Sequence, residues 1–507
     1  MFNLFNRWKA SHRGEATAGS GNARIRSFAA AEQSRILAPW TFDGGFSNGE
    51  VASALAPIRA RSRDMAKNSE QYLRWLDLFV ANVVGSGFTL KAVPCGLGYD
   101  VDTIDTKAAR FLQYHFWKWS RSAKCVDITG RKTFPRFCRL MAENWARDGE
   151  GIAILYRTSE NPYGFTLRAV RPDALDETLN NYYTSGNTVI RNGVEVDLAT
   201  LRPLAYYFRA GKEDPQVTRI GSHNLIRIPA ERVVHIFTQH DEAQTRGIPL
   251  GHAVLKKLKM LDLYNEAELA AARDEANTVG IFYTDKGEEG EVAKLNEDDE
   301  TTALLCQRSD VAQKYVLPNT WKYDSKTPQH PNREVSAFKN SMLRDVASGL
   351  GVEYACFSND WAGVSFSSVR AGTLAERDHW KILQDDFVDM FIAPVYLAWL
   401  KTFLETRLAN PYVPWEFDRL AEFEFRGRTW AWVDPMKDIN SAAIAVEHGW
   451  KTDEQVAAEF GTDFDENLAE AKRVKPLKEA AGLLTKAQKV EPDNTGKEKD
   501  DGEKDDK

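Results

Sequence analysis

A serine lies between glycine and hydroxyl residues in the segment NDWAGVSFSSVRAG, residues 359–372. Its centre, Gly363-Val364-Ser365-Phe366-Ser367, comes close to G-x-S-x-G, the strained strand-to-helix turn on which α/β-hydrolases expose their nucleophile. The final glycine is absent, and the preceding residues form a helical pattern that ends at Gly351 instead of a core strand. The pattern therefore favours a turn followed by a helix, with a serine hydrolase as the weaker alternative.

The acid–base partners that such a serine would need are poorly placed. The downstream candidates, His379 and His448, both lie inside predicted helices, where solvated or capping histidines are common. In the helical interpretation, Ser367 or Ser368 caps the new helix by accepting a hydrogen bond from its free amides. We therefore expect no catalytic role for this serine-rich segment.

Other residues with metal-binding side chains also lack a recognised pattern. His235 alternates with apolar residues on a predicted strand, whereas His240, Asp241 and His252 lie in a loop, so no zinc-ligand spacing occurs. Five cysteines stand far apart without a C-x-x-C pair, as is typical of reduced apolar residues. The phosphate-binding motif G-x-x-x-x-G-K-[ST] is missing. The sequence predicts no catalytic residue, no cofactor and no metal site.

Composition indicates a folded protein of several parts. The chain has 507 residues, enough for two or three domains with separate cores. Its hydrophobic content of 43% and charged content of 27% are those of a globular protein. Its net charge is −7, whereas proteins that grip nucleic acid through the phosphates are usually basic on at least one face. A protein of this charge that meets DNA need not hold it tightly.

The two ends of the chain have a different character from the middle. Residues 1–30 lack hydrophobic periodicity and predict a flexible arm, and 486–507 predict a disordered charged tail. No run of about 18–20 uncharged apolar residues occurs, and Asn3, Asn6 and Arg7 interrupt the apolar region that a signal peptide needs. We therefore expect a cytosolic product without membrane contact.

The first half of the chain predicts helices and then an antiparallel sheet. Hydrophobic periodicity and stop signals predict helices from about Glu50 to Val84, Thr106 to Ser120 and Phe134 to Arg147. From Gly151, short runs of branched and aromatic residues alternate with turn residues. These runs predict a mainly antiparallel β region over 150–238, with Asn192-Gly193 as a hairpin turn.

The second half predicts a stalk and further helices. An amphipathic helix of about 24 residues starts near Leu255, a small β insert follows, and a second helix runs from Glu334 to Gly349. Two helices that bracket an insert predict a stalk with a tip. A long helix from Ser368 to Leu404 should kink at Pro394, which lacks a backbone donor.

The last helical segment runs from Pro435 to about Lys472. Gly449 and the cap residue Thr452 predict a break within it, with the character of a helix-turn-helix. The sequence therefore ends in a small helical region before the charged tail.

Several short patterns in this order resemble the lambda-type portal proteins of tailed bacteriophages. They are Leu317-Pro318, His330-Pro331-Asn332, Gly349-Leu350-Gly351-Val352 and the motif D-x-x-G-V-x-F-S-S-x-R-A-G from Asp360 to Gly372. Stretches around residues 59–92, 245–276 and 427–466 agree too, so the resemblance spans about 59–470. Two departures are Pro318-Asn319, where the family often has Pro-Gly, and the acidic segment Gly287–Glu300, which matches no family pattern.

The resemblance implies an α+β portal fold that assembles as a cyclic ring, commonly of twelve subunits, at one capsid vertex. Double-stranded DNA would be packaged and ejected through this ring. The implied regions are a flexible N-terminal arm (1–30), a wing of helices and antiparallel strands (31–245), a first stem helix (246–278), a clip (279–333), a second stem helix (334–352), a channel loop (353–367), a long kinked wing helix with the following segment (368–426), crown helices (427–485) and the charged tail (486–507).

The resemblance also implies partners and a place of action. The clip would dock the terminase large subunit and later the head-completion or connector protein, and the ring would contact the major capsid or scaffold protein. The protein would be made in the host bacterial cytoplasm and act in the virion, without membrane contact. A capsid adaptor or scaffold protein without a pore remains an alternative.

Two sets of residues become candidates for contact with DNA in the channel. In the first, the loop Tyr354–Ser367 lines or narrows the channel through Asn359, Asp360, Trp361, Gly363, Val364 and Ser365. In the second, Lys256, Lys259, Lys339 or Arg344 form weak basic rings in an otherwise acidic bore. The alternative for the second set is pairing with acidic residues of adjacent subunits.

Overall fold

The computed structural model describes residues 48–96, 103–180, 187–209, 225–277, 281–284, 321–324, 334–430 and 435–481. The predicted arm (1–30) and charged tail (486–507) lie outside these residues. So does the predicted clip (279–333), apart from two short strands.

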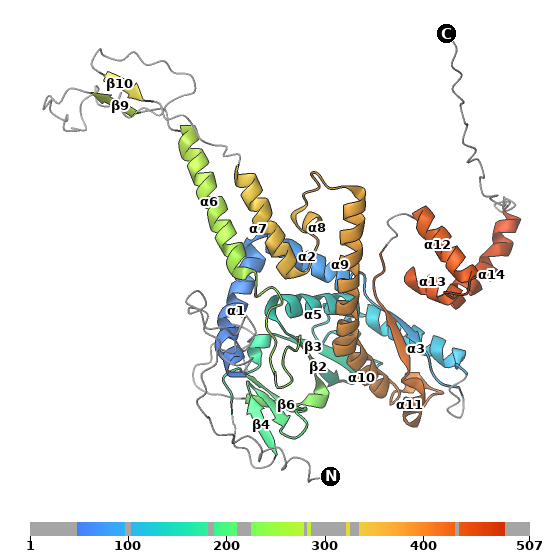
Figure 1. Cartoon of the computed structure of the whole chain (residues 1–507). Coiled ribbons are helices and arrows are strands. Elements are labelled where there is room, and N and C mark those ends of the chain that lie inside the picture. Colours follow the sequence, from blue (N-terminus) through green and yellow to red (C-terminus); the bar gives the residue numbers. More distant parts are fainter. Residues whose placement is uncertain are drawn as a thin grey trace, which may run out of the picture. The chain divides into compact units, whose positions relative to one another are not determined.

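The first helical region consists of two helices (Figure 1), α1 (Asn48–Asn68) and α2 (Glu70–Val83). The predicted single helix from Glu50 to Val84 is therefore wrong in its middle, because Ser69 adopts an extended conformation, with φ −105° and ψ 119°. The break lets both helices pack on α5. In α2, Tyr72, Trp75 and Phe79 recur every three or four residues and are all buried.

The next helices agree with the sequence within one residue. Helix α3 (Thr106–Arg121) begins after Asp105, whose carboxylate accepts hydrogen bonds from two backbone amides of its first turn. The single turn α4 (Ala123–Val126) and helix α5 (Phe134–Asp148) follow. Helix α5 ends at Gly149, whose φ of 83° belongs to the left-handed region that favours glycine.

Two antiparallel sheets follow, as predicted for 150–238. In the first, the strand order is β3 (Phe165–Val170), β2 (Gly151–Arg157), β8 (Val233–Ile236). In the second, the order is β4 (Thr188–Arg191), β5 (Val194–Asp197), β6 (Pro203–Arg209), β7 (Leu225–Pro229). Asn192 and Gly193, with φ of 52° and 84°, connect β4 to β5 in the type I′ hairpin that their types favour.

A buried group of charges joins α1, the start of β2, β8 and the loop after it. We call Arg59, Glu150, His235 and Arg246 the ionic hub. Glu150 Oε2 lies 2.6 Å from Arg59 Nη2, its Oε1 lies 2.8 Å from Arg246 Nε, and all four side chains are at most 3% exposed. Burial would raise the pKa of Glu150, yet Arg246 and Arg59 hold it well below its usual range. The carboxylate is therefore an ionised structural centre.

The predicted stalk is the antiparallel pair of α6 (Leu255–Asn277) and α7 (Glu334–Leu350) (Figure 1). Lys257 Nζ lies 2.8 Å from Asp345 Oδ2, and the rings of Tyr264 and Phe338 meet at 5.2 Å. Near the base of the pair the apolar residues Leu255, Leu258, Leu261, Leu343, Val346, Ala347 and Leu350 are buried. Beyond the helices, β9 (Ile281–Thr284) pairs antiparallel with β10 (Trp321–Asp324).

The predicted long helix is interrupted just before its proline. Helix α9 (Phe366–Phe387) leads into a π-helical turn at Val388–Ile392 and then into α10 (Ala393–Phe403). Pro394 has no backbone N–H and cannot donate the hydrogen bond of an α-helix. The wider π-helical turn directly before it lets the helix continue without that bond. Buried aromatic rings on this element pack in the main core: the ring centres of Phe387 and Phe391 lie 5.4 Å apart in a tilted arrangement, and those of Trp399 and Phe403 lie 4.8 Å apart and stacked.

The remaining elements close the core and end the chain. The single turn α11 (Phe417–Leu420) precedes β11 (Phe423–Arg426), which pairs antiparallel with β1 (Thr89–Ala92). Short 3₁₀ turns lie at Pro172–Ala174, Ala230–Arg232, Arg407–Ala409 and Pro414–Glu416.

Three helices occupy the end of the described chain: α12 (Pro435–Glu447), α13 (Asp453–Glu459) and α14 (Phe464–Ala480). The break predicted at Gly449 and Thr452 is confirmed, since Thr452 caps α13 in a capping box. A second break follows at Gly461, whose φ is 74°. No helix in the described residues combines the length and the apolar character that a bilayer crossing demands.

Candidate functional site

The predicted channel loop begins where α7 ends. Gly351, with φ 68°, reverses the chain, and the amide of Val352 donates to the carbonyl of Ala347 at 3.1 Å. A Cβ atom at position 351 would lie only 2.9 Å from His379 Nε2. The histidine of α9 and the glycine after α7 are thus packed together, which fixes where the loop starts.

Five residues of the predicted loop are helical instead. Helix α8 (Tyr354–Ser358) forms because the carboxylate of Glu353 accepts a hydrogen bond from the amide of Ala355. Ala355 and Phe357 are each 2% exposed. The buried pair anchors the loop in the main core, and the expectation of an irregular segment from Tyr354 is corrected accordingly.

The exposed part of the loop is a tight turn held by its own polar groups. We call Asn359–Ser365 the channel loop from here on. Asn359 has φ 57°, and Asp360 Oδ1 accepts from the amide of Ala362 at 3.1 Å. The Tyr354 hydroxyl donates to Asp360 Oδ2 at 3.1 Å. Burial and this hydrogen bond both raise the pKa of Tyr354. The Asp360 carboxylate is therefore a structural acceptor within the turn.

Other side chains of the channel loop are open to solvent. Trp361 is 50% exposed, and a side chain at Gly363, whose φ is 71°, would touch no atom within 4 Å. Asn359 is also exposed and Val364 is half-buried. The structure therefore brings all six predicted loop residues into one turn between α8 and α9.

Ser365 ends the channel loop as the cap of α9. Its Oγ accepts a hydrogen bond from the amide of Ser368 at 3.2 Å, and it contacts the hydroxyl of Ser368 at 2.8 Å. The prediction that Ser367 or Ser368 is the cap is wrong, because the helix begins two residues earlier than expected, at Phe366. The two histidines considered as bases are engaged elsewhere: His379 at Gly351 and His448 on the ring of Trp450.

The four predicted basic residues do not gather at one point. The Arg344 guanidinium lies 5.1 Å from the ring centre of Tyr354, which links α7 to the channel loop. Burial and the charge of Glu70 raise the pKa of Asp262, while the charges of Lys259 and Lys339 act in the opposite direction. Lys256 is exposed on α6. The four residues therefore have different surroundings within their own chain.

Sequence reasoning missed the anchoring residues of the loop. Glu353 and Tyr354 act through their hydrogen bonds, and Arg74 of α2 donates to the carbonyl of Cys356 at 3.4 Å. The sequence did contain a signal for Glu353, since an acidic residue just before a short apolar stretch is typical of a helix cap. No local pattern could have found Arg74, which is 282 residues away from its partner.

The residues considered as metal ligands stay apart. His235 belongs to the ionic hub, and His252 Nδ1 lies 2.9 Å from the carbonyl oxygen of Pro249. In the described part of the chain, no group of three or more histidine, cysteine or acidic residues could hold a metal ion. Four of the cysteines, Cys95, Cys125, Cys138 and Cys356, are free thiols.

Comparisons with known proteins agree with the resemblance. The family model described as "Phage portal protein, lambda family" matches residues 33–384. A probable portal protein of Halomonas phage phiHAP-1 is 31% identical over 430 residues, 83% of this chain and 81% of that protein. Portal protein B of Escherichia phage lambda is 23% identical over 477 residues, 85% and 86% of the two chains.

Among solved structures, one chain from the neck of an empty gene transfer agent particle aligns with a TM-score of 0.46 and 11% identity, over 84% of this chain and 98% of that one. This distant likeness adds nothing to the family match. The family model spans more than half of the chain, and the Halomonas phage protein is similar over most of both sequences. This chain therefore belongs to the lambda family of phage portal proteins.

Proposed function

We propose that this protein assembles into a closed ring of twelve copies at one capsid vertex. Double-stranded DNA enters the head through the ring during packaging and leaves through it during ejection. Membership of the portal family motivates this proposal. Within the chain, one observation carries it: α6 and α7 keep several large apolar side chains in solvent.

This apolar surface lies on the stalk, on turns of α6 that also carry buried residues and farther along both helices. Met260, Leu263 and Leu269 of α6 are 62%, 48% and 66% exposed, and Phe338 of α7 is 47% exposed. Several large apolar groups along two neighbouring helices indicate a surface that another protein covers. A closed ring of identical copies covers such a surface on every subunit and leaves no open edge. The stalk pair is then the stem of the ring.

The other regions take their roles from this arrangement. The wing (31–245 and 368–426) contacts the major capsid or scaffold protein, and the clip (279–333) docks the terminase large subunit and later the connector. The crown (427–485) contains α12, α13 and α14. The ring acts in the virion after synthesis in the host cytoplasm, and it has no membrane partner.

The channel loop faces the DNA. It lies in solvent, yet α8 fixes one end and the Ser365 cap fixes the other. Its sequence from Asn359 to Ser365 contains a carboxylate and no lysine or arginine. Such a loop narrows a bore without holding phosphates, because binding to DNA depends on cations that neutralise them.

The basic candidates on the stem have two possible roles. Lys256, Lys259, Lys339 and Arg344 either form weak basic rings or pair with acidic residues, in their own or adjacent subunits. The charges of Lys259 and Lys339 act on Asp262, which makes this carboxylate one candidate partner for them. DNA retention measured over a salt series, in particles with lysine-to-alanine changes, separates the two roles, since only phosphate contacts alter the salt slope.

The ring is a conduit and not a catalyst. The Ser365 hydroxyl serves as a helix cap, and the two candidate histidines contact Gly351 and Trp450. A serine-reactive probe should therefore leave the purified protein unlabelled.

Electron microscopy of the purified protein tests the ring directly. We expect top views with cyclic symmetry and a central hole. Monomers or dimers alone at high concentration would count against the proposal. Rings or plates without a central hole would favour the alternative, a capsid adaptor or scaffold protein without a pore.

A further inference from the structure

Helix α3 carries a basic and aromatic face that the proposed conduit does not use. At 3.6 residues per turn, six exposed side chains fall within about 100° of the helix surface: Lys107, Arg110, Tyr114, Trp117, Lys118 and Arg121. The helix contains no acidic residue. Tyr114 and Trp117 are 53% and 58% exposed. Two large aromatic rings in solvent among four cations are unusual for a helix whose opposite face is buried in the core.

A groove of about 580 Å³ runs beside this face. Its apolar lining comes from Phe88 and Leu90 near β1, Phe116 of α3 and Pro135 of α5, and its rim includes Arg110 and Arg121. None of the lining residues is acidic. We call this site the α3 groove. It combines these apolar side chains with the polar residues Thr89, Gln113 and Ser120 and with positive charge at its edge.

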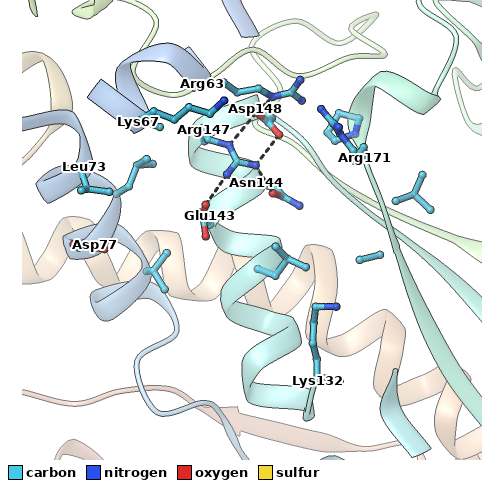
Figure 2. A pocket seen from close by; sticks show the side chains of 17 residues that line it. Arg63, Lys67, Leu73, Asp77, Lys132, Glu143, Asn144, Arg147, Asp148 and Arg171 are labelled. Atoms are coloured by element: carbon cyan, nitrogen blue, oxygen red, sulfur yellow. Dashed lines mark hydrogen bonds and ion pairs between the residues drawn. The ribbon is translucent and has the colours of Figure 1, made fainter. Parts of the chain in front are cut away.

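The larger pocket in Figure 2 makes the contrast clear. That pocket, of about 640 Å³, has Asp77, Glu143 and Asp148 among its lining residues. Its arginines are already paired: Arg147 Nη1 lies 2.6 Å from Glu143 Oε1, and Arg63 Nε lies 2.8 Å from Asp148 Oδ1. The third arginine, Arg171, and Lys132 are paired as well, with Asp173 and Asp127, so these charges hold the fold together.

The cations of the α3 groove have no such partners. In the described residues, neither Arg110 nor Arg121 makes an ion pair with an acidic side chain, and Lys118 contacts only the ring of Tyr114, at 5.8 Å. The protein as a whole has a net charge of −7. A local excess of positive charge on an acidic protein indicates a negatively charged partner.

We propose that the α3 groove docks an acidic peptide segment of another protein, with an apolar side chain inserted between Trp117 and the groove floor. Tyrosine, tryptophan and arginine together are typical of the residues that dominate protein interfaces. The DNA backbone has charge but offers no apolar side chain to fill the floor. This proposal does not depend on the ring or the channel.

Fluorescence anisotropy with the full-length protein tests it. The probe is a labelled peptide of about a dozen residues, glutamate and aspartate around a central Leu-Phe pair. Three comparison probes replace the acids by lysine, replace Leu-Phe by Ser-Ser, or are a short DNA duplex. We expect the acidic apolar peptide to bind about tenfold more tightly than each of the others, a difference of about 1.4 kcal/mol.

Variants place the binding on the helix. The double change Arg110→Glu, Arg121→Glu should weaken binding of the acidic peptide about tenfold or more. Trp117→Ala should weaken binding of this peptide without changing the salt dependence of its affinity. Arg61→Glu is the control, because Arg61 is exposed on α1, away from the α3 groove. If the double variant does not fold, Arg110→Gln with Arg121→Gln serves in its place.

Four results would overturn the proposal. Equal binding of the acidic and lysine peptides would remove the charge argument. A loss of peptide affinity in Arg61→Glu as large as in the double variant would do the same. Tighter binding of duplex DNA, lost in the double variant, would make the face a nucleic-acid site. Loss of ring assembly in the double variant would make it a contact between copies of this chain. If the wild-type protein formed no ring but still bound the acidic peptide, only the proposed conduit function would be contradicted.

Discussion

Gly149 and Gly363 have nearly the same backbone conformation, with φ of 83° and 71°, in opposite surroundings. A side chain at Gly149 would overlap the backbone of Ile248 and Pro249, whereas one at Gly363 would meet nothing within 4 Å. The first glycine ends α5 beside the ionic hub, and the second lies in the channel loop. In the hub, contacts with neighbouring atoms limit which side chain each position can hold. In the channel loop, the backbone conformation of the turn is the main limit.

Charge follows the same division. Glu150 in the hub is fully buried between Arg59 and Arg246, and both of its carboxylate oxygens face a guanidinium group. Asp360 in the channel loop bonds to Tyr354 and the backbone but stays partly in solvent. The hub is therefore held by buried contacts on every side, whereas the channel loop is held by α8, by the Ser365 cap and by the hydrogen bonds of Asp360. Substitutions in the two regions should therefore separate stability from function.

The largest effect on stability is expected for Glu150→Gln. Removing the carboxylate charge leaves two buried guanidinium groups without compensation, which should lower the free energy of unfolding by about 3–5 kcal/mol. Urea denaturation measures the loss. The matched control is Glu405→Gln, which breaks the solvent-exposed pair with Arg157 and should cost about 1 kcal/mol or less. Equal losses in the two variants would contradict the description of the hub.

The two glycines allow a direct test of the comparison. Gly149→Ala should destabilise the protein by about 2–5 kcal/mol, because an unfavourable φ adds to overlap with neighbouring backbone. Gly363→Ala should cost only the strain of the unfavourable φ, about 1–2 kcal/mol, and this strain should be confined to the channel loop. The two midpoints in thermal unfolding should differ clearly. A Gly363 variant that melts as early as the Gly149 variant would mean that the loop is packed as tightly as the hub.

Ser365→Ala should have a smaller, local effect. Loss of the cap costs about 1 kcal/mol and should show as faster amide hydrogen exchange in the first turn of α9. Ser367→Ala is the control, since its hydroxyl is not the one that accepts from the Ser368 amide. DNA packaging should persist in phage carrying Ser365→Ala. Complete loss of function with unchanged exchange would favour a chemical role for the hydroxyl.

The smallest effect on stability is expected for the loop surface. Replacing Asp360, Trp361 and Val364 together by alanine should change the free energy of unfolding by about 1 kcal/mol or less, because these side chains are exposed or half-buried. The proposed role in the channel predicts reduced DNA packaging or retention in the same variant. Normal packaging and retention would remove the channel loop from the proposed function.

Most elements were predictable because their signals are local. Gly149 ended a periodic helix, Asn192-Gly193 marked a hairpin, and Thr452 with Gln455 formed a capping box, all within a few residues. The family resemblance seen in the segment from Asp360 to Gly372 is confirmed by the family match.

The errors arose where tertiary contacts decide. The periodicity of 50–84 continues through Ser69, so the break between α1 and α2 depends on the packing of both helices against α5. The start of α9 at Phe366 depended on which of three neighbouring hydroxyls accepts the first amide, and spacing does not distinguish them. The ionic hub was not foreseen, because its members come from segments almost two hundred residues apart.

The pairing of β1 with β11 has a consequence for how the protein is made. Ala92 leaves the ribosome about 330 residues before its partner Phe423, an interval on the order of half a minute at ordinary bacterial translation speeds. Until then β1 presents unpaired backbone groups, and such edges recruit foreign strands. A growing chain must therefore be shielded for most of its synthesis, and a fragment that ends before Phe423 should be prone to aggregate even though the stalk helices are complete.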